Sequence, residues 1–287
     1  MLQDIGEHKI EVVYDPKAVL GYKDYVIGFE EKEVLVKEKE KDFCFLTCEE
    51  LLTEGYQKET FEKYQKDGIF LMRIDGRALF LLPDKYFKRC GKTVRYPVNI
   101  MKSMDAGPVS YGVVNAWHLK QWYDTTRFCG ACGIRLRHSK SERAMECPIC
   151  GNIIYPHISP AVIVGVVHGD KILVTKYDKK AKYYALVAGY CEIGETIEDT
   201  VHREVFEETG VKVKNLKYYK SQPWGFSGSL LSGFFVTLDG KDQIHMDEHE
   251  LSVARWISRS ELDGKDESRI SLTGEMIEYF RIHPEAF

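Results

Sequence analysis

The sequence lacks any run of residues apolar enough to cross a membrane. One long stretch without a charged side chain is Ser221–Leu238, which holds four serines, three glycines, a glutamine and a proline. Such residues are unfavourable in hydrocarbon. The N-terminus, MLQDIGEHKIEV, also lacks the basic flank and apolar segment of a signal peptide. We therefore expect a cytoplasmic protein with no membrane span.

An excess of positive charge is also absent. The 287 residues include 40 Lys and Arg against 44 Asp and Glu, a formal net charge of −4. No overall positive field is therefore available to hold long nucleic acids, although a local basic patch stays open. Internal repeats and low-complexity segments are absent as well. The hydrophobic fraction of 44% is that of an ordinary globular protein, and the length predicts two domains with a small additional module.

The pattern of apolar runs divides the chain into three parts. We expect residues 1–124 to form a β-rich domain with a linking helix over 107–122, residues 125–157 a cysteine module, and residues 158–287 a second domain. In the first part, Asp75-Gly76 can supply the positive φ angles of a tight turn within a hairpin from Ile69 to Leu82. In the last part, strands are expected at 161–167, 171–176, 183–187, 211–219, 230–238 and 251–257, and helices at 196–209 and 272–280.

Four of the eight cysteines form two matched pairs. Cys129-x2-Cys132 and Cys147-x2-Cys150 are separated by 14 residues, and a glycine follows each pair. Four thiolates can close a tetrahedral shell around Zn²⁺ and leave no open position for catalysis. Disulfides would need an oxidising compartment that nothing in the sequence indicates, and a thioredoxin-like redox role would not need two pairs. We therefore expect structural zinc.

The segment GYCEIGETIEDTVHREVFEETGV, residues 189–211, holds the second informative pattern. On a helix, Glu204, Glu207 and Glu208 fall on one stripe, where like charges repel one another unless a cation neutralises them. Carboxylate ligands with room for water suit Mg²⁺ or Mn²⁺ bound together with a phosphate. The alternative is a solvated acidic face, but such a face normally carries Lys at i+4, and here only Arg203 is near.

This spacing resembles the box of the Nudix family at every defining position. The resemblance implies an α+β fold in which an α/β/α sandwich with a mixed sheet follows the zinc ribbon and the β-rich N-terminal domain. It also implies hydrolysis of a nucleoside diphosphate linked to another moiety. The matching residues are Gly189, Glu195, Arg203, Glu204, Glu207, Glu208 and Gly210, with Val205 and Val211 at the aliphatic positions.

The resemblance assigns roles to these residues. It implies that Glu204 and Glu208 ligate the divalent metal and that Glu207 serves the same cluster. Arg203 would orient a glutamate of the box through a salt bridge. The backbone carbonyl just before the box, that of Ala188, would be a further metal ligand.

Hydrolysis of a pyrophosphate places further demands on the site. Water attacks one phosphorus in line, while metal ions stabilise charge on the bridging and non-bridging oxygens. The attacking water also needs a base. Glu250 resembles a downstream functional glutamate of the family and is our candidate for a further metal ligand or for this base. It could instead be an exposed glutamate of a helix or turn.

The segment SQPWGFSGS, residues 221–229, resembles the signature SQPWPFPxS of the NADH pyrophosphatase branch of the family, which also carries a four-cysteine ribbon before the Nudix domain. Gly225 and Ser227 replace the two later prolines, which would make the loop more flexible and broaden its specificity. Trp224 and Phe226 could pack against a base, or they could be core residues. The predicted substrate-binding residues of this segment are Gln222, Pro223, Trp224, Gly225, Phe226, Ser227, Gly228 and Ser229.

Within that set, Gln222 and Ser229 would orient the base by hydrogen bonds. Three positions elsewhere also resemble substrate contacts of the branch: Glu142 in the ribbon, Tyr155 just after it, and Thr273. Tyr155 could stack on a base or could equally be a core tyrosine.

The resemblance therefore implies hydrolysis of NAD(H) to NMN(H) and AMP by a homodimer whose active site draws on both subunits. Removal of NAD caps from RNA 5′ ends is a further activity to test. Two alternatives stay open. One is a different Nudix substrate, such as ADP-ribose or another dinucleotide. The other is a non-enzymatic, nucleotide-sensing nucleic-acid binder, which would have no need of the full set of glutamates.

Overall fold

The computed structural model describes residues 1–39, 42–52, 58–262 and 270–287. The described residues separate into two compact units. One unit contains Met1–Gln3, Ile158–Trp224 and Gly228–Phe287, and the other contains Asp4–His157 and Gly225–Ser227. The three N-terminal residues therefore pack with the C-terminal half of the chain.

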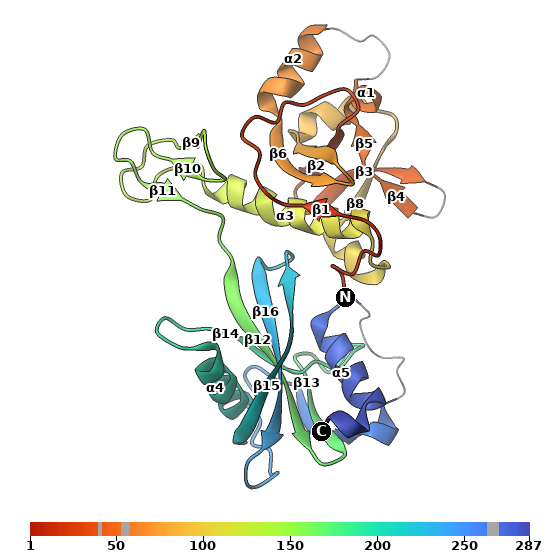
Figure 1. The fold of residues 1–287 in the computed structure, drawn as a ribbon, viewed down its shortest axis with the longest axis vertical. Coiled ribbons are helices and arrows are strands. Elements are labelled where there is room, and N and C mark those ends of the chain that lie inside the picture. Colours follow the sequence, from red (N-terminus) through yellow and green to blue (C-terminus); the bar gives the residue numbers. More distant parts are fainter. Residues whose placement is uncertain (40–41, 53–57, 263–269) are drawn as a thin grey trace. The chain divides into compact units, whose positions relative to one another are not determined.

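The unit of the C-terminal half is built on a mixed sheet (Figure 1). Its elements are β12 (Ser159–His168), β13 (Lys171–Lys176), β14 (Val187–Tyr190), α4 (Ile197–Thr209), β15 (Val213–Trp224), β16 (Ser229–Leu238), β17 (Val253–Ser258) and α5 (Leu272–Ile282). The strands lie in the order β15-β16-β12-β13-β17, and β14 pairs with β12. The neighbours β12 and β16 run parallel, whereas the other pairs are antiparallel.

Helices α4 and α5 cover opposite faces of this sheet (Figure 1). Successive side chains of a strand point to opposite faces, and β12 uses both. Val162 and Val164 join the buried cluster that contains Val201 of α4, whereas Ile163 joins the cluster that contains Met276 of α5. Apolar residues on both faces produce the predicted α/β/α sandwich.

Two strands of this sheet differ from the sequence-based prediction. The strand expected at 183–187 begins only at its last residue, because Ala185 makes no more than an isolated bridge with Thr175. The strand expected at 211–219 continues to Trp224, because β16 supplies pairing partners along that whole length. The loop predicted to begin at residue 221 is therefore a short turn after β15.

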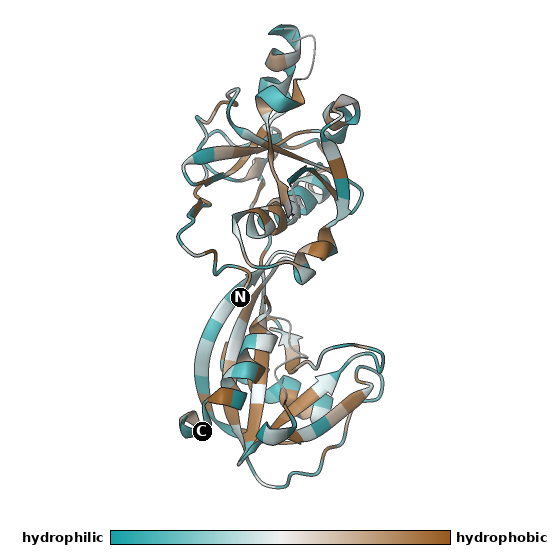
Figure 2. Cartoon of the chain, turned by 90° about the vertical axis from the view of Figure 1, so that its right-hand side faces the viewer, coloured by the Kyte–Doolittle hydropathy of each residue, from teal (hydrophilic) through white to brown (hydrophobic). Residues whose placement is uncertain are grey.

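The N-terminal domain is β-rich, as predicted. Its strands lie in the order β1-β6-β7-β2-β3-β4, with β5 paired to β2 and β8 paired to β3. Figure 2 shows apolar residues along these strands, whose inward side chains form the core. Its elements are β1 (Ile10–Glu11), β2 (Tyr25–Glu30), β3 (Glu33–Lys39), β4 (Asp42–Cys44), β5 (Leu46–Thr47), α1 (Cys48–Leu51), α2 (Lys58–Asp67), β6 (Ile69–Ile74), β7 (Arg77–Leu81), η1 (Asp84–Arg89), β8 (Thr93–Pro97) and η2 (Val98–Ser103).

Strands β6 and β7 form the predicted hairpin. Asp75 and Gly76 adopt φ angles of 50° and 78°, as the tight turn requires. The pairing of β6 with β7 shifts by one residue between Phe70 and Met72, so Leu71 forms a bulge. Helix α2 was not predicted from the sequence. It buries Phe61 and Tyr64 against the sheet.

The linking helix and the cysteine module follow. Helix α3 (Pro108–Thr125) has a proline in its first turn, where no backbone donor is needed. The ribbon strands β9 (Arg137–His138), β10 (Met145–Glu146) and β11 (Ile153–Ile154) pair in the order β11-β10-β9. Trp122 near the end of α3 packs against ribbon residues. None of the helices in the described ranges is long and apolar enough to cross a bilayer.

The centre of β2 gives a test of core packing. A β-carbon at Gly28 would lie 2.4 Å from Cε2 of the buried Phe87 ring. Gly28→Ala should therefore lower the free energy of unfolding by roughly 1–3 kcal/mol, measured by urea denaturation. Gly91→Ala is the matched control, because a β-carbon there meets nothing within 4 Å. Equal stability of the two variants would contradict this packing.

Candidate functional site

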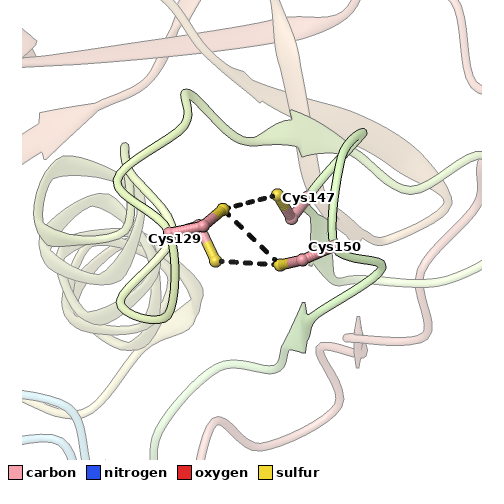
Figure 3. Close-up of side chains that lie close together, drawn as sticks. Cys129, Cys147 and Cys150 are labelled. Atoms are coloured by element: carbon pink, nitrogen blue, oxygen red, sulfur yellow. Dashed lines mark hydrogen bonds between the residues drawn. The ribbon is translucent and has the colours of Figure 1, made fainter.

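The four predicted zinc ligands come together in the ribbon. The sulfur atoms of Cys129, Cys132, Cys147 and Cys150 all lie within 4.8 Å of one another. Cys129 and Cys150 are 3.6 Å apart at sulfur, and Cys132 and Cys147 are 3.5 Å apart. Figure 3 shows the side chains of Cys129, Cys147 and Cys150 turned toward one another.

This arrangement fits zinc. Four sulfurs at about 2.3 Å from a tetrahedral ion lie roughly 3.8 Å from each other, close to the observed separations. The glycine after each pair has a φ angle near +72° and donates its N–H to the carbonyl of the first cysteine of its pair. This positive φ explains the two glycines noted in the sequence. Four sulfur ligands leave no position for water, so the site suits a structural ion.

Helix α4 carries the glutamates of the Nudix-like segment. Thr196 caps its N-terminus, where the hydroxyl of Thr196 accepts from the N–H of Asp199 at 3.1 Å. Gly210 ends the helix in the left-handed conformation, with φ at 71°. These local signals fix the register of the helix, and the register sets which carboxylates face the sheet.

Arg203 holds the glutamates together. Its guanidinium makes two hydrogen bonds to the carboxylate of Glu195, at 2.6 and 2.9 Å, and one to Glu204 at 2.8 Å. It also donates to Glu207 at 2.9 Å and to the backbone carbonyl of Tyr190 at 2.9 Å. The hydrogen bonds from Arg203 lower the pKa of Glu195 to about 2. The salt bridge predicted for Arg203 is therefore a network of three.

Glu208 is the buried carboxylate of α4, and Glu204 beside it is partly buried. Glu208 is 2% exposed, and its Oε2 has no hydrogen-bond partner. Burial, together with the charges of Glu204 and Glu250, raises the pKa of Glu208 to about 8. Burial also raises the pKa of Glu204, against the opposing effect of Arg203. Gly189 lies beneath Glu204, where an added β-carbon would be 1.9 Å from the carboxyl carbon.

The candidate Glu250 lies in a loop that is attached to the end of α4. The N–H of Asp247 donates to the carbonyl of Glu208 at 3.0 Å, and the N–H of His245 donates to that of Thr209 at 2.9 Å. Glu250 is exposed, and its charge acts on both Glu204 and Glu208. The backbone N–H of Ala188 hydrogen-bonds the carboxylate of Glu208.

These residues fit a divalent cation. A buried carboxylate oxygen without a partner, beside two further carboxylates, is unfavourable alone and is stabilised by a hard cation. Glu207 differs from Glu204 and Glu208, because its side chain is 59% exposed and points to Arg203. Among the described residues, only the cysteines bring three or more ligand atoms within 4.8 Å of one another. The glutamates do not form so compact a group of ligand atoms.

The side chain of Gln222 does not project from the predicted substrate segment. It is fully buried in β15, donates to the carbonyl of Ile270 at 2.8 Å and to the side chain of Gln3 at 3.0 Å, and accepts from the N–H of Leu272 at 2.7 Å. These bonds fix the chain start and the first turn of α5, which contains Thr273. They argue against the base-orienting role predicted for Gln222.

The turn after β15 explains one departure from the branch signature. A β-carbon at Gly225 would lie 2.6 Å from the carbonyl oxygen of Val114 in α3. Proline cannot occupy that position without displacing the helix backbone. The ammonium of Lys102 lies 4.9 Å from the ring centroid of Phe226, so this ring makes a cation–π contact. Ser227 next to it is exposed.

The remaining residues of the segment lie in or beside the strands. Pro223 and Trp224 end β15 and are partly buried, and Gly228 has a φ angle of 69°. Ser229 begins β16, is 3% exposed, and shares a hydrogen bond of 3.1 Å with the hydroxyl of Tyr190. In the ribbon, the hydroxyl of Tyr155 donates to the carboxylate of Glu142 at 3.0 Å.

Two tyrosines of the site were missed from the sequence. Tyr190 joins the two motifs, because its carbonyl binds Arg203 and its hydroxyl binds Ser229, while 51% of the residue is exposed. Its position directly after the first glycine of the box was the available signal. The phenol of Tyr177 has a raised pKa, caused by burial and by the charges of Glu208 and its neighbours. No sequence pattern indicated Tyr177.

Comparison with known proteins agrees with this geometry. A NUDIX domain model matches residues 157–279, and the NADH pyrophosphatase zinc ribbon domain matches residues 124–155. A protein of Mannheimia succiniciproducens named NAD-capped RNA hydrolase NudC is 32% identical over 219 residues, which are 73% of this chain and 79% of that protein. A protein of the same name from Chromobacterium violaceum is 43% identical over 150 residues, 52% of this chain and 56% of that protein. This second match spans little more than half of its relative.

A crystal structure of a NUDIX hydrolase from Nitrosomonas europaea is also similar. It is 22% identical, with a TM-score of 0.46, and the match covers 54% of this chain and 90% of that one.

The sandwich and its glutamate helix define a metal-dependent hydrolase of phosphate anhydrides, and the chain belongs to the Nudix family. Its four-cysteine module is the zinc ribbon of NADH pyrophosphatases. The predicted family, fold and enzyme class are confirmed. A purely non-enzymatic role is not supported.

The ribbon gives a simple prediction. Purified protein should contain about one zinc per chain, measured by inductively coupled plasma mass spectrometry. Cys147→Ser should lose this zinc and lower the unfolding temperature, because Cys147 is buried at the centre of the ribbon. Cys44→Ser, outside the cluster, should retain it. Retention of zinc by Cys147→Ser would contradict the assigned ligand set.

Glu208 gives a prediction about pH. In metal-free protein its pKa of about 8 lies above the value of 4.5 for an ordinary glutamate, so between these values the folded state holds a proton that the unfolded state does not. The free energy of unfolding should then fall as pH rises from 5 to 8, with a slope of up to about 1.4 kcal/mol per pH unit from this group. Glu208→Gln should remove this contribution.

The measurement is urea denaturation in chelator at several pH values. Glu198→Gln is the matched control, because Glu198 is an exposed glutamate of the same helix. Identical pH profiles for wild type and Glu208→Gln would show that Glu208 is not a buried, protonated group.

Proposed function

We propose that this protein hydrolyses the pyrophosphate bond of NAD(H), producing NMN(H) and AMP, and that it removes NAD caps from RNA 5′ ends. Family membership and the zinc ribbon support the first activity. The names of the Mannheimia and Chromobacterium relatives support the second. The observation that carries the proposal is the buried, unpartnered oxygen of Glu208 beside Glu204 and within the field of Glu250.

The proposed cofactor is Mg²⁺ or Mn²⁺, held by Glu204, Glu208 and Glu250 with the carbonyl of Ala188 and assisted by Glu207. When bound, the ion stabilises negative charge on phosphate oxygens and lowers the pKa of a coordinated water. Carboxylate and carbonyl oxygens are the ligands that these ions prefer. Binding would also remove the proton that burial places on Glu208.

The protein's own residues then position the reaction. Arg203 fixes the carboxylate of Glu204 by direct hydrogen bonding, and Gly189 permits that carboxylate to lie against the backbone of β14. Glu250 is exposed, so the alternative to its role as a metal ligand is to accept a proton from the attacking water. Attack in line at one phosphorus expels a nucleoside monophosphate, so no covalent enzyme intermediate is required.

Tyr190 is the proposed link between chemistry and substrate recognition. Its partly exposed ring stands between Arg203 of the metal site and Ser229 of the signature segment. A flat base packed on this ring would be oriented relative to the glutamates. Glu142 and Tyr155 of the ribbon are likewise proposed as substrate-binding residues.

We further propose that the protein is a cytoplasmic homodimer. All eight cysteines are described and unpaired, which suits a reducing compartment where thiolates can hold zinc. The homodimer follows from the family resemblance. Size-exclusion chromatography with light scattering tests the dimer.

The proposed function is tested by chromatographic product analysis. NADH, NAD⁺, ADP-ribose and NAD-capped RNA are each incubated with Mg²⁺, Mn²⁺ or chelator. Formation of NMN(H) and AMP, or of 5′-monophosphorylated RNA from the capped substrate, only with metal is the expected result. Cleavage of ADP-ribose alone would keep the Nudix chemistry but overturn the substrate. The absence of any cleavage would overturn the enzymatic proposal.

Glu207→Gln should lower turnover about 100-fold or more, because it removes a carboxylate from the metal cluster, while leaving the zinc content unchanged. Glu198→Gln on the same helix should retain wild-type turnover. Steady-state kinetics with NADH at saturating Mn²⁺ give the comparison. Unchanged turnover in Glu207→Gln would remove this residue from the catalytic set.

A further inference from the structure

Arg143 of the ribbon is bound in an unusual way. Its guanidinium donates to three backbone carbonyls of the N-terminal domain: Leu71 at 2.6 Å, Val12 at 3.3 Å and Phe70 at 3.4 Å. It pairs with no carboxylate among the described residues. Burial consequently lowers its pKa, although an arginine in a protein stays charged.

The three carbonyls are available because the sheet is incomplete at this point. Strand β1 pairs with β6 only at Ile74 and Arg73, so the rest of β6 forms an open edge. The bulge at Leu71 interrupts the regular pairing with β7 on the other side. Arg143 therefore occupies the place that a longer β1 would fill, and its planar donors satisfy backbone groups that would otherwise lack partners.

Aromatic rings complete the binding of this side chain. The guanidinium carbon lies 5.1 Å from the centroid of the Tyr14 ring, within cation–π range. The side chain of Tyr123 in α3 forms a hydrogen bond with Arg143. Contacts from two segments of the N-terminal domain and from the linking helix thus fix one ribbon residue.

The anchoring of Arg143 also affects Glu142, the residue before it in the chain. Glu142 precedes Arg143 in the loop between β9 and β10, and consecutive Cα atoms are about 3.8 Å apart. The loop is closed by a bond from the N–H of Ser139 to the carbonyl of Ala144 at 2.9 Å. The carboxylate of Glu142 in this loop accepts a hydrogen bond from the hydroxyl of Tyr155. The contacts that hold Arg143 in place therefore also hold the carboxylate of Glu142 in place.

We propose that Arg143 is a positioning residue for substrate binding: by capping the open edge of β6 it holds the loop that presents the Glu142–Tyr155 pair to the dinucleotide. This inference rests on the proposed function, in which that pair contacts the substrate. Arg143 itself touches backbone and rings of its own chain and acts through Glu142.

The test compares Arg143→Met and Arg143→Lys with the wild type. Arg143→Met should raise the KM for NADH about five-fold or more while kcat stays within about two-fold, because ground-state binding is weakened and the metal site is untouched. Arg143→Lys should be intermediate, since an ammonium lacks the planar fork. Arg135→Met is the matched control, because Arg135 is an exposed ribbon arginine outside this contact.

Two readouts separate positioning from general stability. Amide hydrogen exchange over residues 139–145 should become faster in Arg143→Met, with zinc content unchanged. In a Glu142→Gln background, adding Arg143→Met should change KM by less than about two-fold, because Arg143 acts through Glu142. Additive effects, or a joint loss of kcat and zinc, would overturn the proposal.

Failure of the proposed function can be distinguished from failure of the role inferred for Arg143. Wild-type protein that cleaves no dinucleotide would overturn the proposed function and the substrate part of this inference. Hydrogen exchange in the same variants would still decide whether Arg143 anchors the loop. Unchanged exchange in Arg143→Met would overturn the anchor itself.

Discussion

The hydrogen bonds of Arg203 are the constraint on which the catalytic half of the structure depends. Glu195, Glu204 and Glu207 would repel one another in its absence, and all three bind the one guanidinium. The same group binds the carbonyl of Tyr190, which ties helix α4 to the end of β14. An ammonium could not make this set of contacts, because only a planar fork offers donors in several fixed directions.

Arg203 compensates only part of the charge. Glu208 lies outside its reach, is almost fully buried, and retains an oxygen without a partner. A desolvated carboxylate in this state is stabilised by a proton or by a cation. Glu204 and Glu250 add negative potential around it, which would favour the proposed divalent ion over a proton. In the proposed metal site, metal affinity and folding stability would therefore be coupled at this residue.

The sequence predicted the parts of the site that depend on neighbours along the chain. The two cysteine pairs each form one turn with a glycine at positive φ, and the cap at Thr196 together with Gly210 sets the ends of α4. Such features need only a few consecutive residues. The separate strands and helices of the C-terminal domain were predictable for the same reason, since apolar runs and helical periodicity are local properties. Their arrangement as an α/β/α sandwich was expected from the family resemblance.

Features that depend on distant partners could not be predicted. Gln222 resembles a surface residue of a binding loop, yet its amide is used by Gln3 and Ile270, residues at opposite ends of the chain. The extension of β15 to Trp224 depends on pairing with β16. From the sequence alone, Gly225 indicates a more flexible loop. In the structure, a β-carbon at this position would collide with the carbonyl oxygen of Val114. In each case the partner is determined by tertiary structure.

In the proposed function Glu142 contacts the substrate, and the structure of the ribbon explains why zinc alone would not position it. Zinc would fix the two cysteine turns, but Glu142 lies in the loop between β9 and β10, outside both turns, and each of these strands contains only two residues. So short a hairpin cannot hold its loop rigidly. Rigidity has to come from a larger body, and Arg143 supplies it by binding the edge where β1 stops and β6 bulges. The irregularity of the N-terminal sheet is thus what allows the ribbon to be held in a defined place.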